Sequence, residues 1–203
     1  MLLWSKLSDY LKPQKHFFTV LLAICFLGFL AGCFYSNLIS DTDFTNAGIQ
    51  AEEFIKQAKE NGLSFQLMLS EELSPALFIA AFSLFLPGLI PIVFLIFKWG
   101  FSTGFFMTFL VRYFSMKGFF LSGFFLITNL CIFLPALLIL SIKSIKTNVF
   151  LLTAVLSRIT HKTTIWEEIL GLTVATLVAI LLIAFGTAIK TLLLPPLCSY
   201  LFL

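Results

Sequence analysis

The sequence predicts an all-α membrane protein in which about five transmembrane helices form a single polytopic domain over residues 1–203. Two observations lead to this prediction. Sixty per cent of the residues are apolar and only 11% are charged, with a mean hydropathy of +1.04. Several stretches of 19 to 25 residues carry no charge, and about 20 mostly apolar residues let a helix cross a bilayer. This composition excludes a disordered chain, a cytosolic enzyme and a secreted disulfide scaffold.

The expected spans are separated by charged residues. The stretches 17–35 and 73–97 contain no charge, and Lys98 with its neighbour Trp99 ends the second one. A tryptophan beside a lysine is typical of a helix end at the membrane interface. The third span is short and crosses only if the Arg112 side chain reaches the interface. We expect spans at 17–35, 73–97, 99–114, 118–142 and 169–189.

Residues 36–72 form the only long polar stretch and are expected as an outer loop. They hold seven acids against two lysines, a net charge of −5. Apolar side chains recur there at helical spacing, which predicts a short amphipathic helix. This helix lies either at the membrane surface or on the bundle as a solvated loop helix. Its candidate contact residues for a partner are Phe54, Ile55 and Ala58.

Two further segments are expected outside the spans. Residues 143–164 mix basic and apolar side chains and are expected to form an inner interfacial helix beside anionic headgroups. The tail 191–203 is apolar but contains Pro195 and Pro196, so it is expected to pack on the bundle or in the interface. Short interfacial helices therefore accompany the spans.

The placement of lysine and arginine predicts the orientation in the membrane. With five spans and a cytoplasmic N-terminus, eight of the 13 basic residues face the cytoplasm and five face outside. The N-terminus is therefore expected in the cytoplasm of a multi-pass cell-membrane protein, and the loop 36–72 is expected outside. An alternative concerns residues 30–33, which read Leu-Ala-Gly-Cys, the pattern of a lipoprotein processing site with Cys33 acylated.

Small, helix-breaking and polar residues mark candidate packing positions. Two GxxxG pairs permit close helix contact. The motif LPGLIP at 86–91 predicts a kink or break inside the span 73–97, because proline frees backbone carbonyls. Asn129 is the most polar residue inside a span and needs a hydrogen-bond partner. The candidate helix-packing or partner-contact positions are Gly28, Gly32, Pro87, Gly88, Pro91, Gly100, Gly104, Asn129 and Pro135.

The sequence contains no recognisable constellation for catalysis or metal binding. His16 and His161 have no obvious cysteine or serine partner, and no carboxylate is expected deep inside a span. Nucleotide-binding and metalloprotease motifs are absent, and the basic residues follow the membrane edges instead of forming a nucleic-acid surface. We therefore expect no catalytic residue, no metal, no cofactor and no nucleic-acid partner.

The centre of the chain, 86–139, combines a proline–glycine break, a following glycine pair, the turn Lys117-Gly118, and a span with Asn129 before Pro135-Ala136. In these features it resembles the stage II sporulation protein M family. The basic N-terminus, the first glycine-paired span and the outer polar loop also fit, so the resemblance covers most of the chain.

A broader related group of membrane proteins carries Pro-His-Gly and a glutamate ahead of the Pro-Ala. Here the region reads Thr128-Asn129-Leu130 and then Phe133. This departure argues against intramembrane His/Glu chemistry and favours the sporulation branch.

The resemblance implies a non-enzymatic integral membrane scaffold that acts in forespore engulfment. Members of the family recruit stage II sporulation proteins D and P, which degrade septal peptidoglycan, at the septal membrane of the mother cell. The lipid bilayer is the other expected partner, and self-association stays open.

The alternative is a small membrane transporter, channel or permease subunit. Proline-broken spans line substrate sites in many transporters, and the break at 87–91 lies near Ser83 and Asn129. No repeat between the halves and no buried charge is expected, which weighs against transport. An enzyme acting on lipid or cell wall is disfavoured because it lacks a nucleophile–base pair.

Overall fold

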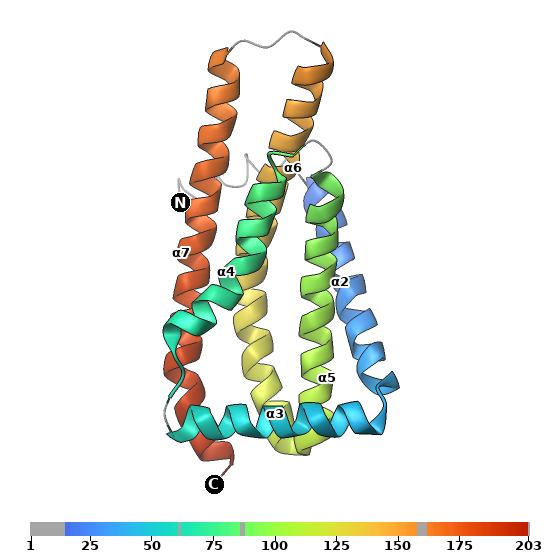
Figure 1. Ribbon diagram of the computed structural model, residues 1–203, viewed down its shortest axis with the longest axis vertical. Coiled ribbons are helices and arrows are strands. Elements are labelled where there is room, and N and C mark those ends of the chain that lie inside the picture. Colours follow the sequence, from blue (N-terminus) through green and yellow to red (C-terminus); the bar gives the residue numbers. More distant parts are fainter. Residues whose placement is uncertain (1–14, 61, 86–87, 158–161, 203) are drawn as a thin grey trace.

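The computed structural model describes residues 15–60, 62–85, 88–157 and 162–202, and in these residues every regular element is a helix (Figure 1). The prediction of an all-α membrane protein is confirmed. The described elements are α2 (Lys15–Leu38), α3 (Asp41–Glu60), α4 (Phe65–Phe82), α5 (Leu89–Thr128), the π-helix η2 (Asn129–Phe133), α6 (Leu134–Ser157) and α7 (Lys162–Leu201).

Helix α3 lies across one end of the bundle, roughly perpendicular to the other helices (Figure 1). Ser40 caps its start: the Asp43 N–H donates to Ser40 Oγ at 3.3 Å, and Ser40 Oγ donates to the Asp43 carboxylate at 2.7 Å. Ile55 and Ala58 are buried against the bundle. The sequence left open whether this amphipathic helix lies at the membrane surface or on the bundle, and the structure favours a helix packed on the bundle.

The turn between the second and third spans lies between α4 and α5, whereas the sequence predicted it at Lys98. Helix α4 ends at Phe82 and α5 starts at Leu89, and the two run in opposite directions (Figure 1). The predicted span 73–97 is therefore wrong, since it joins the end of one helix to the start of the next. A proline–glycine pair ends a helix more strongly than one lysine does, because a lysine can stay helical.

Helix α5 doubles back at Ser115, which has a φ of 53°. The ring centroids of Phe106 and Phe125 lie 5.3 Å apart, although 19 positions separate these residues in sequence. A Cβ on Gly118 would lie 1.9 Å from the carbonyl oxygen of Leu110. The helix therefore consists of two antiparallel arms, 89–114 and 116–128.

The second arm continues through η2 into α6 without a break in direction (Figure 1). The predicted inner interfacial segment 143–164 is therefore not a separate helix. Its residues 143–157 extend α6, where Ser144, Ile145 and Asn148 are buried, and 162–164 begin α7, whereas 158–161 lie outside the described residues. The tail is also helical, because α7 continues through Pro195 and Pro196 to Leu201.

Four continuous stretches of the described chain are long and apolar enough to cross a membrane. The third of them reverses at Ser115 and so contributes two passes. The passes are antiparallel to their neighbours along the chain (Figure 1). The four stretches are His16–Leu38, Phe65–Phe82, Leu89–Ala154 and Ile165–Leu201.

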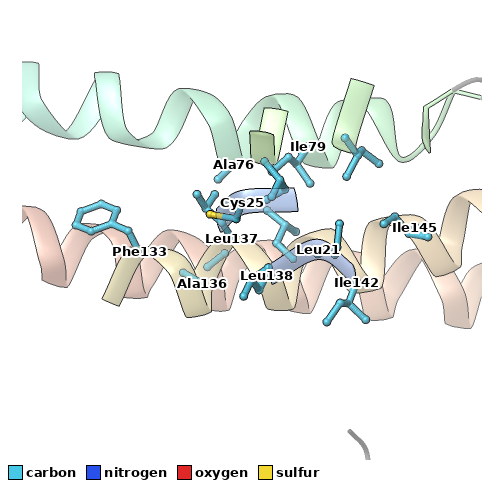
Figure 2. Close-up of a cluster of buried hydrophobic side chains, with 14 of the residues drawn as sticks. Leu21, Cys25, Ala76, Ile79, Phe133, Ala136, Leu137, Leu138, Ile142 and Ile145 are labelled. Atoms are coloured by element: carbon cyan, nitrogen blue, oxygen red, sulfur yellow. The ribbon is translucent and has the colours of Figure 1, made fainter. Parts of the chain in front are cut away.

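The larger of two buried apolar clusters lies where α2, α4, η2 and α6 meet, and α5 and α7 also contribute side chains to it (Figure 2). Leu21 and Cys25 of α2 point toward Ala76 and Ile79 of α4, and a row of α6 side chains packs beside them. Most other large apolar side chains are exposed, as expected for helices that face lipid. The α6 and η2 residues labelled in the core are Phe133, Ala136, Leu137, Leu138, Ile142 and Ile145.

The two glycine pairs interlock α2 with the first arm of α5. A Cβ on Gly32 would lie 2.1 Å from the Phe101 carbonyl oxygen, and one on Gly104 would lie 2.1 Å from the Phe29 carbonyl oxygen. Gly28 and Gly100 have equally close backbone neighbours across the interface. Backbone lies against backbone, so the interface has no room for a side chain.

We expect Gly104→Ala to lower the melting temperature of the detergent-solubilised protein. The added methyl group must push two backbones apart, at a cost of about 1–3 kcal/mol, which outweighs the roughly 0.5–1 kcal/mol that alanine gains in a helix. Gly123→Ala is the matched control, because nothing lies within 4 Å of its added Cβ. Equal melting temperatures for the two variants would contradict the interlock.

Candidate functional site

A cavity of about 1120 Å³ lies between α3, α4 and the two arms of α5, with Phe133 of η2 and Lys190 of α7 also in its wall. Its wall is largely aromatic, and polar groups occupy a few positions. Clefts of this kind, apolar with a few converging polar groups, are the usual form of ligand sites. The aromatic residues that line it include Phe78, Phe82, Phe94, Trp99, Phe105 and Phe109.

An ion pair inside the bundle lies in the wall of this cavity. Lys190 Nζ donates to Glu72 Oε1 at 2.6 Å and to Asn129 Oδ1 at 2.8 Å. Thr187, one turn before Lys190, donates its hydroxyl to the other Glu72 oxygen. The polar cluster of Glu72, Asn129, Thr187 and Lys190 therefore ties together α4, η2 and α7.

This cluster is removed from solvent. The Lys190 side chain is 5% exposed and that of Glu72 is 17% exposed. Lys190 Nζ also lies 4.0 Å from the centroid of the Phe133 ring, in cation–π geometry. Charged groups at membrane depth are rare, pair with one another and mark functional sites, so the cluster is the leading candidate.

Proline explains how the backbone presents Asn129. Pro135 has no N–H and clashes with the preceding turn of a regular α-helix. The chain widens into η2 just before it, and the Leu134 N–H donates to the Asn129 carbonyl oxygen five residues earlier. A π-helix of this kind is often found at functional sites. Here it carries the Asn129 amide to the ammonium group of Lys190.

Lys98 and Ser102 line the cavity from α5, one turn apart. Both side chains are exposed. Within the described part of the chain, Lys98 makes no ion pair or hydrogen bond, in contrast to Lys190. The predicted role of Lys98 as the end of a span is wrong, because it lies nine residues inside α5.

Helix α3 is fixed to the bundle by polar contacts at its two ends. The Arg112 guanidinium donates to the Ser36 carbonyl oxygen and lies 4.4 Å from the Phe44 ring centroid. Lys59 Nζ donates to the Phe202 carbonyl oxygen at 3.0 Å. Arg112 therefore caps the end of α2, a role beyond the predicted extension of its side chain to the membrane interface.

The predicted contact residues of α3 do not form a free surface. Ile55 is 5% exposed and Ala58 is fully buried, so neither is accessible to a partner. Phe54 is 36% exposed and lines the cavity. Ile55 and Ala58 are buried because the apolar stripe of an amphipathic helix faces its own bundle when that bundle lies beside it.

The other predicted positions lie at three places in the structure. The four paired glycines form the α2–α5 interface, whereas Asn129 belongs to the polar cluster. Gly88 starts α5, and a Cβ there would lie 1.7 Å from the Phe82 carbonyl oxygen. Pro91 lies in the first turn of α5 and lines the cavity. Pro87 lies outside the described residues.

Three of the four cluster members, Glu72, Thr187 and Lys190, were not predicted from the sequence. Glu72 was assigned to the outer loop and Lys190 to the end of the last span, so the expectation of no buried charge is wrong. The sequence did contain an indication of this pair, because Glu72 and Lys190 each lie in a largely apolar helix and carry opposite charges. Asn148 was missed as well: its amide donates to the Ser83 carbonyl oxygen at 3.3 Å and to that of Phe85.

We expect Glu72→Gln or Lys190→Met alone to lower the free energy of unfolding by about 3–5 kcal/mol, because each leaves an uncompensated charge in the bundle. The double variant should lose much less than the sum, and thermal unfolding in detergent measures this coupling. Glu168→Gln is the control, since the Lys143–Glu168 pair is more exposed, and it should cost at most about 1 kcal/mol. Additive losses would show that the pair is not formed.

Comparison with models of protein families, with characterised proteins and with solved structures finds no match to the chain.

Proposed function

We propose that the chain is a non-enzymatic membrane scaffold in sporulation, which recruits peptidoglycan-degrading partners during forespore engulfment. The resemblance of residues 86–139 to the stage II sporulation protein M family supports this proposal, with sporulation proteins D and P as the partners. In this proposal the N-terminus is cytoplasmic, and α3 faces the outside of the mother-cell septal membrane.

One observation carries the proposal: α3 is held rigidly across the end of the bundle with a polar face outward. Tyr113 donates to the Glu52 carboxylate at 3.0 Å, and a Cβ on Gly48 would lie 1.9 Å from the Tyr113 ring. The opposite face exposes Glu53 and Glu60. A fixed helix with an exposed charged face is suited to binding a partner with a basic surface, because fixing it in advance lowers the entropic cost of binding.

We expect the double variant Glu53→Lys/Glu60→Lys to lose at least about tenfold in affinity for the partners, since reversing two charges turns attraction into repulsion. Co-purification of proteins D and P of the same organism with the full-length chain measures this. Glu167→Lys is the control, because it reverses an exposed acid on α7, far from α3, and should leave capture unchanged. Failure of the unaltered chain to capture either partner would overturn the proposal.

The second candidate is a small membrane transporter, channel or permease subunit. The observation that favours it is the aromatic cavity with the Glu72–Lys190 pair in its wall. One of the two sequence arguments against transport was the absence of buried charge, and that argument no longer holds. Polar groups near the membrane midplane are the usual setting of a substrate or coupling-ion site.

Flux measurements on proteoliposomes separate the two candidates. The scaffold proposal predicts equal proton, potassium and chloride fluxes in vesicles with and without the protein. Flux that requires the protein and is lost in Glu72→Gln would instead support the transport function.

A further inference from the structure

Lys98 exposes its ammonium group to the largely aromatic cavity and has no ion-pair partner among the described residues. Lys98 lies nine residues after Leu89, about 13 Å along the helix at 1.5 Å per residue. It therefore lies well inside a stretch that is long and apolar enough to cross a membrane. A lysine at this depth is costly unless an anion meets it. Among the described residues none does.

The charges that face the cavity are unevenly distributed. Lys190 is neutralised by Glu72, which leaves Lys98 and Glu71 without an ion-pair partner among the described residues. Glu71 lies six residues after the start of α4, close to the end of the bundle that α3 covers. Lys98 lies in the half of the first α5 arm that is farther from α3. This arrangement attracts an anionic group toward Lys98 and repels it from the α3 end.

The edge of the cavity faces the region that acyl chains would occupy. Phe78 of α4 and Phe94 of α5 both line the cavity, and they are 53% and 61% exposed. A ligand can therefore enter from the bilayer between α4 and α5. The volume of about 1120 Å³ exceeds the roughly 300–1,000 Å³ of most small-molecule pockets.

From these features we infer that the cavity binds an anionic phospholipid, with its phosphate at Lys98 and Ser102 and its acyl chains against the phenylalanine side chains. The ammonium group of Lys98 and the hydroxyl of Ser102, one helical turn apart, supply donors for phosphate oxygens. The aromatic wall supplies apolar area for the chains. This inference concerns binding alone, so it goes beyond the scaffold proposal and does not depend on transport.

Native mass spectrometry of the full-length chain tests the inference. The protein is released from mixed micelles that contain equal amounts of phosphatidylglycerol and phosphatidylcholine with identical acyl chains. We expect several-fold preferential retention of phosphatidylglycerol, a near loss of that preference in Lys98→Met, and its recovery in Lys98→Arg. Lys56→Met is the control, because Lys56 is an exposed lysine on α3 outside the cavity wall, and it should keep the preference.

Two results would overturn the inference: equal retention of both lipids by the unaltered chain, or a preference that Lys98→Met leaves intact. Competition with an excess of glycerol 3-phosphate tests whether the cavity binds the whole lipid or only its soluble headgroup. We expect it not to displace phosphatidylglycerol, and displacement at equal affinity would show that the acyl chains and the aromatic wall play no part. Because Lys98 is exposed and has no partner among the described residues, Lys98→Met should unfold at a temperature no lower than that of the unaltered chain, which excludes misfolding as the cause.

Discussion

A carboxylate and an ammonium group inside a membrane bundle must find each other, and the arrangement of the second half of this protein follows from that constraint. Glu72 on α4 and Lys190 on α7 are more than one hundred positions apart in sequence and meet at 2.6 Å. Their contact fixes where α4 stands, and the Asn129 amide adds η2 to the same cluster. The aromatic cavity lies between α4 and α5, with Lys190 in its wall.

The two sides of the bundle are built on different principles. On one side, α2 and α5 touch backbone to backbone through glycines, and Arg112 joins their ends to α3. On the other side, large phenylalanine side chains surround a space that they do not fill. If both proposals hold, the half that presents α3 contacts the protein partner and the half with the cavity contacts the lipid.

The sequence could predict the helical class, the close packing of the glycine pairs and the amphipathic nature of α3. These properties follow from composition and from local spacing. It could not predict the polar cluster, because a charge in an apolar run looks like the end of a span until its partner is known. For this reason Lys98 and Lys190 were predicted at span ends, and Glu72 at the end of the outer loop 36–72. The reversal at Ser115, where φ is 53°, lies between the predicted spans 99–114 and 118–142, so local sequence did indicate a turn there.

Exchanging the two charges tests the pairing most directly. The variant Glu72→Lys/Lys190→Glu keeps one acid and one base at the same two positions, and its thermal unfolding in detergent is compared with those of the two single reversals. If the charges pair inside the bundle, each single reversal is poorly folded and the exchange restores a cooperative transition. An exchanged protein no more stable than the single reversals would contradict the pairing, and with it the position of α4 and the cavity.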